Sequence, residues 1–195
     1  RTLYPEAEFP AGQWEYQKFY EEDFESARAP MEADPYLFVK ALFRRGNPEG
    51  QGKPAGTAYV RRHDGWFRGA DKAPDLPRDR DMVSEADLRA YAASIERNTM
   101  FGPNSYYMNH ERNADYARES VNDGRLDMPV LFVGATYDYT CETARPDVTA
   151  EMVAHCSRYT RADIDCGHWM AQERPTALNG ILARWLVEEA AYWPK

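Results

Sequence analysis

Hydrophobic positions in the first half of the chain recur at helical spacing. Asp34 and Pro35 form a helix start, and the apolar segment that follows covers residues 36–43. A second helix is predicted after a capping box that begins at Ser84, because apolar residues follow at helical intervals: Leu88, Tyr91, Ala92 and Ile95. The stretch between these helices, residues 47–80, is rich in glycine and proline and is expected to be an extended surface loop.

The pattern changes after about residue 127. Two short apolar runs, residues 130–135 and 159–165, have the length of buried strands, and a polar helical segment separates them. An amphipathic helix begins at Pro175 and carries its apolar residues on one face: Leu178, Ile181, Leu182, Trp185 and Leu186. Strand, helix, strand and helix in this order predict parallel strands. Since parallel sheets need both faces covered, we expect the sheet to continue in sequence outside these residues.

Composition places the chain among soluble globular proteins and narrows its partners. It has 195 residues, of which 43% are hydrophobic and 29% charged. The net charge of −8 argues against nucleic acid or an anionic membrane as a partner, and there is no apolar run long enough to span a bilayer. We expect a small neutral or apolar ligand. The three cysteines have no metal-type spacing and favour reduced thiols in a cytoplasmic protein.

Two residues at the ends of the predicted strands can work as a catalytic pair. Asp138 follows the first strand, and His168 follows the second. The carboxyl ends of neighbouring parallel strands meet at one sheet edge, where α/β enzymes place their sites. A carboxylate bonded to one imidazole nitrogen fixes the tautomer and leaves the other nitrogen as a general base. Either residue alone is more often structural, but the pair in this order favours the catalytic interpretation.

Longer motifs connect these residues to a known family. The segments Leu-Phe-Val-Gly-Ala-Thr-Tyr-Asp and Asp-Cys-Gly-His-Trp, which contain Asp138 and His168, resemble the end of soluble epoxide hydrolases. The sequence Trp-Glu-Tyr-Gln around Tyr16 is similar to the Tyr-Gln motif at the start of that family's lid. The sequence beginning at Tyr107 resembles the lid motif Tyr-x-Asn-x-Glu-Arg-Asn, with Tyr106 as the alternative register.

The resemblance implies an α/β class and an incomplete α/β-hydrolase fold. Residues 1–115 would form the helical cap, or lid, and residues 116–195 the last two parallel strands and helices of the core. The family's nucleophilic aspartate turn and its His-Gly-x-Pro segment are absent from the sequence. We therefore expect a fragment that is inactive alone, with the N-terminal portion of the same protein as the partner that supplies the nucleophile.

The activity that the resemblance implies is the hydrolysis of an apolar small-molecule epoxide to a vicinal diol through a covalent ester. Tyr16 and Tyr107 would hold the epoxide oxygen, and His168, oriented by Asp138, would activate water. No metal or organic cofactor is required. The residues expected to contact the substrate are Gln17, Trp14, Tyr106 and Trp169.

Two alternative functions compete with this one. A haloalkane or haloacid dehalogenase would use a similar aspartate, histidine and acid set. Its lid, however, binds halide through groups such as tryptophan, asparagine or histidine rather than two tyrosines, and the pair Tyr16 and Gln17 argues against it. The second alternative is a non-catalytic truncated module, in which Tyr16 and Tyr107 are ordinary half-buried aromatic residues.

Overall fold

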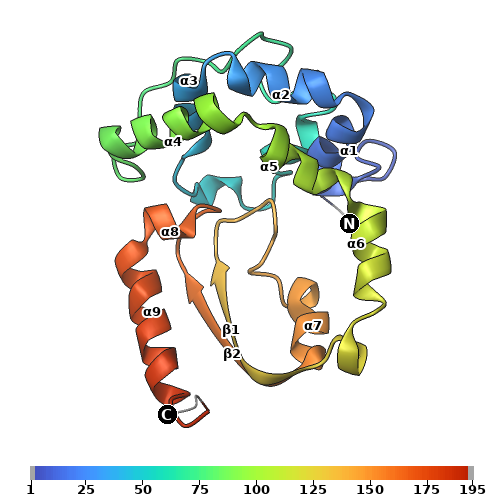
Figure 1. The fold of residues 1–195 in the computed structure, drawn as a ribbon, viewed down its shortest axis with the longest axis vertical. Coiled ribbons are helices and arrows are strands. Elements are labelled where there is room, and N and C mark those ends of the chain that lie inside the picture. Colours follow the sequence, from blue (N-terminus) through green and yellow to red (C-terminus); the bar gives the residue numbers. More distant parts are fainter. Residues whose placement is uncertain (1–2, 193–195) are drawn as a thin grey trace. The chain divides into compact units, whose positions relative to one another are not determined.

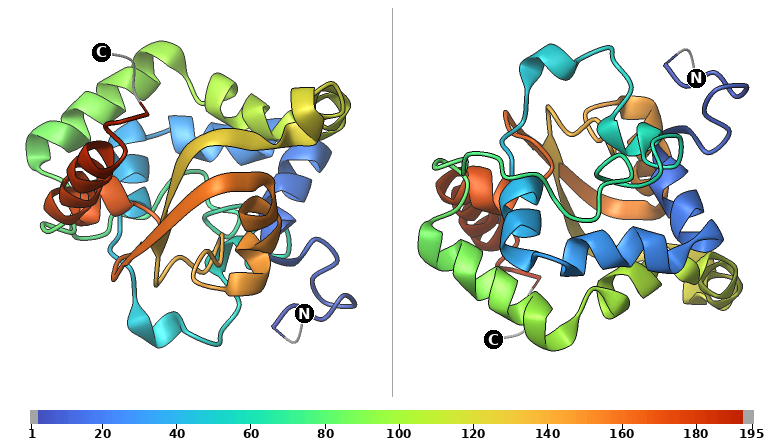
Figure 2. Two further views of the ribbon diagram at one scale, coloured as in Figure 1. Left: turned by 90° about the horizontal axis from the view of Figure 1, so that it is seen from below. Right: turned by 90° about the horizontal axis from the view of Figure 1, so that it is seen from above.

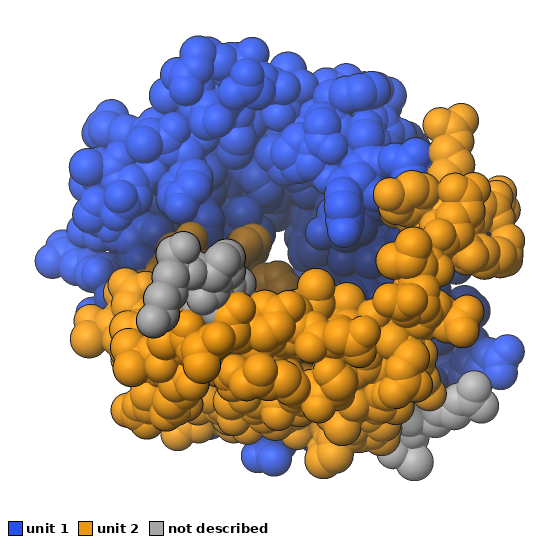
Figure 3. Space-filling model, turned by 60° about the horizontal axis from the view of Figure 1, so that its bottom comes forward, with its two compact units in different colours: residues 1–110 blue, residues 111–195 orange. Residues whose placement is uncertain are grey.

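The structure is a computed structural model that describes residues 3–192. This part of the chain forms two compact units, one ending at His110 and the other beginning at Glu111 (Figure 3). The division lies at the start of helix α6 (His110–Ala117), so the domain boundary predicted after residue 115 lies within this helix.

The first unit is helical, and both predicted helices are present in it. Asp34 caps one of them by accepting a hydrogen bond from the Leu37 amide at 3.0 Å, and Ser84 and Asp87 form the capping box of the other. The sequence did not predict the two helices that precede them. The α-helices of this unit are α1 (Glu15–Glu22), α2 (Phe24–Glu32), α3 (Pro35–Leu42), α4 (Glu85–Asn98) and α5 (Phe101–Ser105), shown in Figure 1.

The core of the first unit forms where the apolar faces of these helices meet. Helices α3 and α4 lie side by side in both views of Figure 2. Leu88 of α4 and Val39 of α3 are among the largest side chains that solvent does not reach. Other buried residues come from α1, α2 and α3, and include Phe19, Tyr20, Ala27, Met31 and Phe38.

Residues 47–80 are more closely packed than the predicted surface loop. They contain short 3-10 helices at Pro48–Gly50 and Gly56–Tyr59. Small apolar residues spaced along this stretch are buried: Ala55, Ala58, Val60 and Ala73. Glycine and proline correctly indicated irregular backbone, but they did not show that alanine and valine between them pack inward. The prediction of a surface loop was therefore wrong for these positions.

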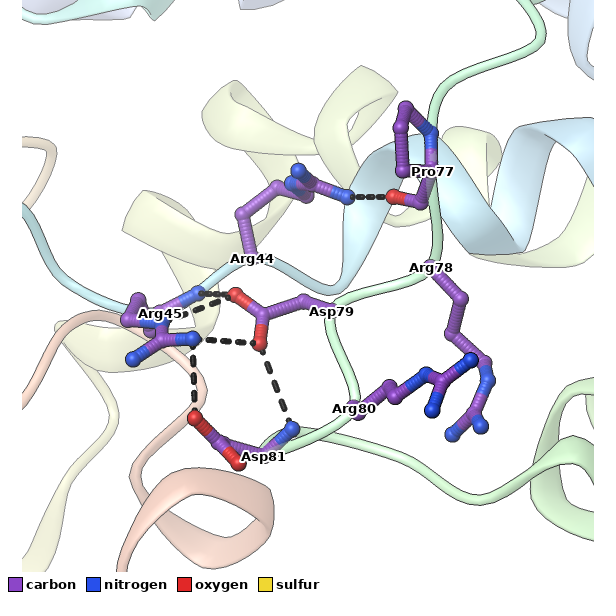
Figure 4. Close-up of a pocket in the computed structure, with 7 residues that line it drawn as sticks. All are labelled: Arg44, Arg45, Pro77, Arg78, Asp79, Arg80 and Asp81. Carbon is purple, nitrogen blue, oxygen red and sulfur yellow. Dashed lines mark hydrogen bonds and ion pairs between the residues drawn. The ribbon is translucent and has the colours of Figure 1, made fainter.

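An ion pair with a buried carboxylate joins the end of this stretch to the segment that follows α3. Asp79 is 9% exposed and accepts hydrogen bonds from the backbone amide and the guanidinium of Arg45. The two residues line a cavity of about 660 Å³ whose other walls are Arg44, Pro77, Arg78, Arg80 and Asp81 (Figure 4). None of the predicted site residues lines this cavity.

The second unit has the predicted order of strand, helix, strand and helix, which confirms the α/β class. Strands β1 (Leu126–Ala135) and β2 (Cys156–Ile164) pair in parallel, with Ala135 opposite Ile164. Helices α7 (Pro146–His155) and α9 (Pro175–Glu188) lie on opposite sides of the strands in Figures 1 and 2, and the short α8 (Met170–Glu173) precedes α9. Within residues 3–192 the sheet consists of these two strands.

The core of the second unit is small. Ala135, Ile164 and Cys166 are buried, and Leu178 and Ile181 of α9 pack against them. The rest of the predicted apolar face of α9 is less covered, since Leu182 is 39% and Leu186 49% exposed. As for membrane spans, none of the helices in the described range has the length and apolar character to cross a bilayer.

We predict that Leu88→Ala lowers the free energy of unfolding of the first unit by about 2–5 kcal/mol, because it removes a fully buried side chain and leaves a cavity. Leu76→Ala, at a position that is 38% exposed in the same unit, is the control and should cost much less. Urea unfolding followed by circular dichroism measures both. Equal effects of the two substitutions would contradict this account of the core.

Candidate active site

The acid and the base predicted at the strand ends lie together. Asp138 Oδ2 is 2.9 Å from His168 Nδ1. The two chain segments that carry them are joined just beyond the strands, where the Thr136 amide donates to the Ile164 carbonyl at 3.0 Å and the Thr136 hydroxyl to Asp165 Oδ1 at 2.9 Å. The predicted contact between the two residues is thus present in the structure.

Asp138 is fixed by hydrogen bonds to both of its oxygens. Oδ1 accepts the backbone amides of Thr140 and Cys141, each at 3.1 Å, while Oδ2 faces His168. Burial alone would raise the pKa of this carboxyl. The hydrogen bond and positive charge of His168, together with the two amides, lower it by more, so the pKa of Asp138 lies below its usual range. Asp138 therefore stays ionised at neutral pH and cannot rotate freely.

His168 is held by one nitrogen and remains accessible. Its side chain is 44% exposed, and Asp138 engages only Nδ1. The hydrogen bond to Asp138, followed by a contact with Cys141, raises the pKa of His168 to about 10 against the opposing effect of burial. The preceding amide, of Gly167, donates to Glu173 Oε2 at 2.8 Å, which fixes the turn that carries the imidazole. The ring is thus oriented, and Nε2 is the nitrogen that Asp138 leaves for proton transfer.

Cys141 is a site residue that the sequence reasoning missed. Asp138, Cys141 and His168 each place one ligand-type atom within 4.8 Å of the other two. The Cys141 backbone amide donates a hydrogen bond to Asp138 Oδ1, and the tight turn that this bond closes places the thiol near the imidazole. Cys166 has no comparable position: it is fully buried, and burial raises the pKa of its thiol to about 11. All three cysteines are free thiols.

The two predicted lid tyrosines meet within the first unit. Tyr16 lies on α1, and Tyr107 lies in the 3-10 turn Tyr106–Met108 after α5. Their ring centroids are 5.3 Å apart at an interplanar angle of 77°, an edge-to-face contact. Tyr106, the residue of the alternative register, is 71% exposed and contacts Tyr107. Of these two neighbours, it is Tyr107 whose ring packs on Tyr16.

A shell of aromatic and polar groups surrounds Tyr16. Gln17 Nε2 donates a hydrogen bond to the Tyr16 hydroxyl oxygen at 2.8 Å. The rings of Trp14 and Trp66 have centroids 6.3 Å and 5.5 Å from that of Tyr16. Of the predicted substrate-contacting residues, Gln17 and Trp14 thus lie beside Tyr16.

Tyr20 and Trp66 belong to the same cluster but were not predicted as site residues. The Tyr20 ring contacts those of Tyr16 and Tyr107, with centroids 5.7 Å and 5.8 Å away. Its hydroxyl accepts a hydrogen bond from Trp66 Nε1 at 2.8 Å, and burial raises its pKa. The signal for Tyr20 was its spacing of four residues from Tyr16, which places both on one helix face. Trp66 lies in the long loop, whose fold the sequence pattern did not define.

The remaining predicted contact residue, Trp169, lies in the second unit. Its ring meets that of His168 edge-on, with centroids 4.9 Å apart. The structure therefore brings the predicted residues together in two groups. One is the tyrosine cluster of the first unit, and the other is the Asp138 and His168 pair of the second.

Curated proteins that are similar in sequence to this chain are epoxide hydrolases. Bifunctional epoxide hydrolase 2 of Sus scrofa is 31% identical over 135 residues, which are 69% of this chain and 23% of that protein. Epoxide hydrolase A of Mycobacterium tuberculosis is 26% identical over 164 residues, which are 82% of this chain and 48% of that protein. The chain is a homologue of the epoxide hydrolases. No protein-family model matches it.

Solved epoxide hydrolases show which fold this homologue shares. The crystal structure of epoxide hydrolase A from Mycobacterium thermoresistibile matches 88% of this chain and 51% of its own, with a TM-score of 0.63 and 23% identity. A Vigna radiata epoxide hydrolase mutant matches 92% of this chain and 55% of its own, with a TM-score of 0.62. The homologue thus has a partial α/β-hydrolase fold. It spans less than half the length of the curated relatives it matches.

We predict that Asp138→Asn lowers the pKa of His168 toward its ordinary value, because the substitution removes the charge that stabilises the imidazolium. NMR titration of the imidazole in metal-free buffer measures the change. In the unsubstituted chain, the stabilisation of folding that comes from the raised pKa of His168 is fully present below the unfolded pKa of about 6.5, as long as Asp138 is ionised, and is lost as pH rises through about 10. A His168 pKa near 6.5 in both proteins would contradict the pairing.

Proposed function

We propose that this chain provides the cap and the acid–base residues of an epoxide hydrolase that converts an epoxide and water to a vicinal diol through a covalent ester. The observation that carries the proposal is the packing of Tyr16 against Tyr107 in a chain that also pairs Asp138 with His168. Two phenols and an oriented imidazole match the two chemical steps of this reaction. The epoxide hydrolase homologues support the same reaction class.

In the first step, a carboxylate attacks an epoxide carbon and the carbon–oxygen bond breaks. We place the nucleophile in the N-terminal portion of the same protein, outside these 195 residues. Negative charge grows on the ring oxygen, and Tyr16 and Tyr107 would stabilise it by donating hydrogen bonds, each worth on the order of 3 kcal/mol. One tyrosine then gives its proton to the alkoxide, because an alkoxide is a much stronger base than a phenolate.

In the second step, His168 takes a proton from water, and the hydroxide attacks the ester carbonyl. The ester bond breaks, which regenerates the carboxylate and frees the diol. Asp138 stabilises the imidazolium that forms and keeps Nε2 directed at the water. The proton that His168 gains balances the one that the tyrosine gave up. Side chains thus handle every proton, and the reaction as written uses no cofactor.

The proposed substrate is an apolar small-molecule epoxide. Trp14, Tyr106 and Trp169 would contact this substrate, since their aromatic rings suit an apolar ligand. Gln17 would act on Tyr16 as well as contact the substrate, since its amide donates a hydrogen bond to the phenol oxygen. We also propose that the protein acts in the cytoplasm, where its free thiols stay reduced.

Trapping of the ester tests the assignment of the two steps. The chain is expressed together with the segment that carries the nucleophile and is exposed to a styrene-oxide-type epoxide. His168→Gln should accumulate a protein adduct of substrate mass, because only the second step needs the base. The double variant Tyr16→Phe with Tyr107→Phe should form no adduct, because the first step loses both donors. Intact-protein mass spectrometry distinguishes the two results.

The matched control is Tyr116→Phe, which removes a hydroxyl from a residue that is 78% exposed on α6. It should turn over the epoxide at the unmodified rate without adduct. If the double phenylalanine variant turns over the epoxide at the rate of the unmodified protein, the two tyrosines are structural and the proposal is refuted. The absence of turnover and of adduct in all variants, with folding intact, would favour a non-catalytic module.

A further inference from the structure

Cys141 has no part in the proposed reaction, yet its sulfur lies at the acid–base pair. One oxygen of Asp138, the sulfur of Cys141 and one ring nitrogen of His168 all lie within 4.8 Å of one another. Within residues 3–192, no other three histidine, cysteine or acidic residues form such a group. The arrangement joins oxygen, sulfur and nitrogen atoms from two chain segments that the paired strands hold together.

These three atoms match the ligand set of a zinc-type ion. Zinc binds cysteine sulfur, histidine nitrogen and carboxylate oxygen, and sites with three protein ligands leave a fourth position open. Tetrahedral bonds of about 2.0–2.3 Å require ligand atoms about 3.3–3.8 Å apart. In the structure, Asp138 Oδ2 and His168 Nδ1 are 2.9 Å apart, and the ligand atoms of the three residues all lie within 4.8 Å of one another. Side-chain shifts of about 1 Å would therefore complete the geometry.

The surroundings of the three residues favour binding as well. The backbone amides of Thr140 and Cys141 fix Asp138 through Oδ1, which leaves Oδ2 for the ion. His168 is 44% exposed and Cys141 is half-buried, so an ion can enter from solvent. The other two cysteines lack this setting. Cys166 is fully buried. Cys156 lies at the start of β2, at the opposite end of the paired strands from the turn that carries Asp138.

We propose that Asp138, Cys141 and His168 form a binding site for one thiophilic divalent cation, Zn²⁺ or Cd²⁺. On binding, the cysteine thiol releases its proton to solvent, and the ion takes the place of the proton between Asp138 Oδ2 and His168 Nδ1. The imidazole proton then resides on Nε2, which can no longer accept a proton from water. The ion would therefore inhibit hydrolysis of the ester. This consequence rests on the proposed function, whereas binding itself does not.

Cadmium reports directly on the sulfur ligand. Titration of the purified chain with Cd²⁺ should produce the ultraviolet charge-transfer absorption of a cadmium–thiolate bond and saturate at one ion per chain. Cys141→Ser should abolish this absorption and weaken binding at least tenfold, as measured by calorimetry. The matched control, Cys156→Ser, should leave both unchanged. Zn²⁺ should displace Cd²⁺ from the same site.

His168→Gln supplies a second test that keeps the thiol. It should retain weakened cadmium–thiolate absorption, with circular dichroism confirming that the variant is folded. The site is refuted if Cys141→Ser binds Cd²⁺ as the unmodified chain does, or if the absorption depends on Cys156. Should Cd²⁺ bind through Cys141 without inhibiting epoxide hydrolysis by the complete enzyme, the site stands and the role of His168 as base fails.

Discussion

The parallel pairing of β1 with β2 is the constraint on which the acid–base site depends. The register places Ala135 opposite Ile164, so that the turns after the two strands begin side by side. A slip of two residues would keep the same faces inward but move one turn by about 6.6 Å along the strand. The 2.9 Å contact of Asp138 with His168 would then be lost. The cysteine next to the pair depends on the same register, because it lies on the turn that follows β1.

In the proposed reaction, the two groups of site residues divide the chemistry between the two units. The tyrosine cluster of the first unit supplies neutral hydrogen-bond donors in an aromatic setting, which suits an oxygen that acquires charge. The second unit supplies an ionised carboxylate that holds an imidazole through Nδ1, an orientation that suits the transfer of a proton from water to Nε2. In the proposed reaction neither group is sufficient alone, and a nucleophile outside these residues completes the set.

The sequence predicted those features that depend on periodicity or on a local motif. The strand ends located Asp138 and His168, and motif similarity selected Tyr16 and Tyr107. The sequence pattern did not predict α1, whose apolar positions are aromatic and flanked by charged residues, or α2, which contains few large apolar residues and has Pro30 in its interior. The turn that brings Cys141 back to His168 has no periodic signal, because it depends on side-chain bonds to Asp138. Burial of alanines within residues 47–80 depends on contacts with distant helices, which no local pattern records.

We propose that the tyrosine pair and the Asp138 and His168 pair act on one substrate. A crystal structure of the chain together with the segment that carries the nucleophile, with a diol product bound, tests it most directly. We expect one diol oxygen to lie about 3 Å from both the Tyr16 and Tyr107 hydroxyls, with His168 Nε2 within hydrogen-bond reach of the same product. A product held away from either pair, or the two pairs opening onto separate pockets, would contradict it.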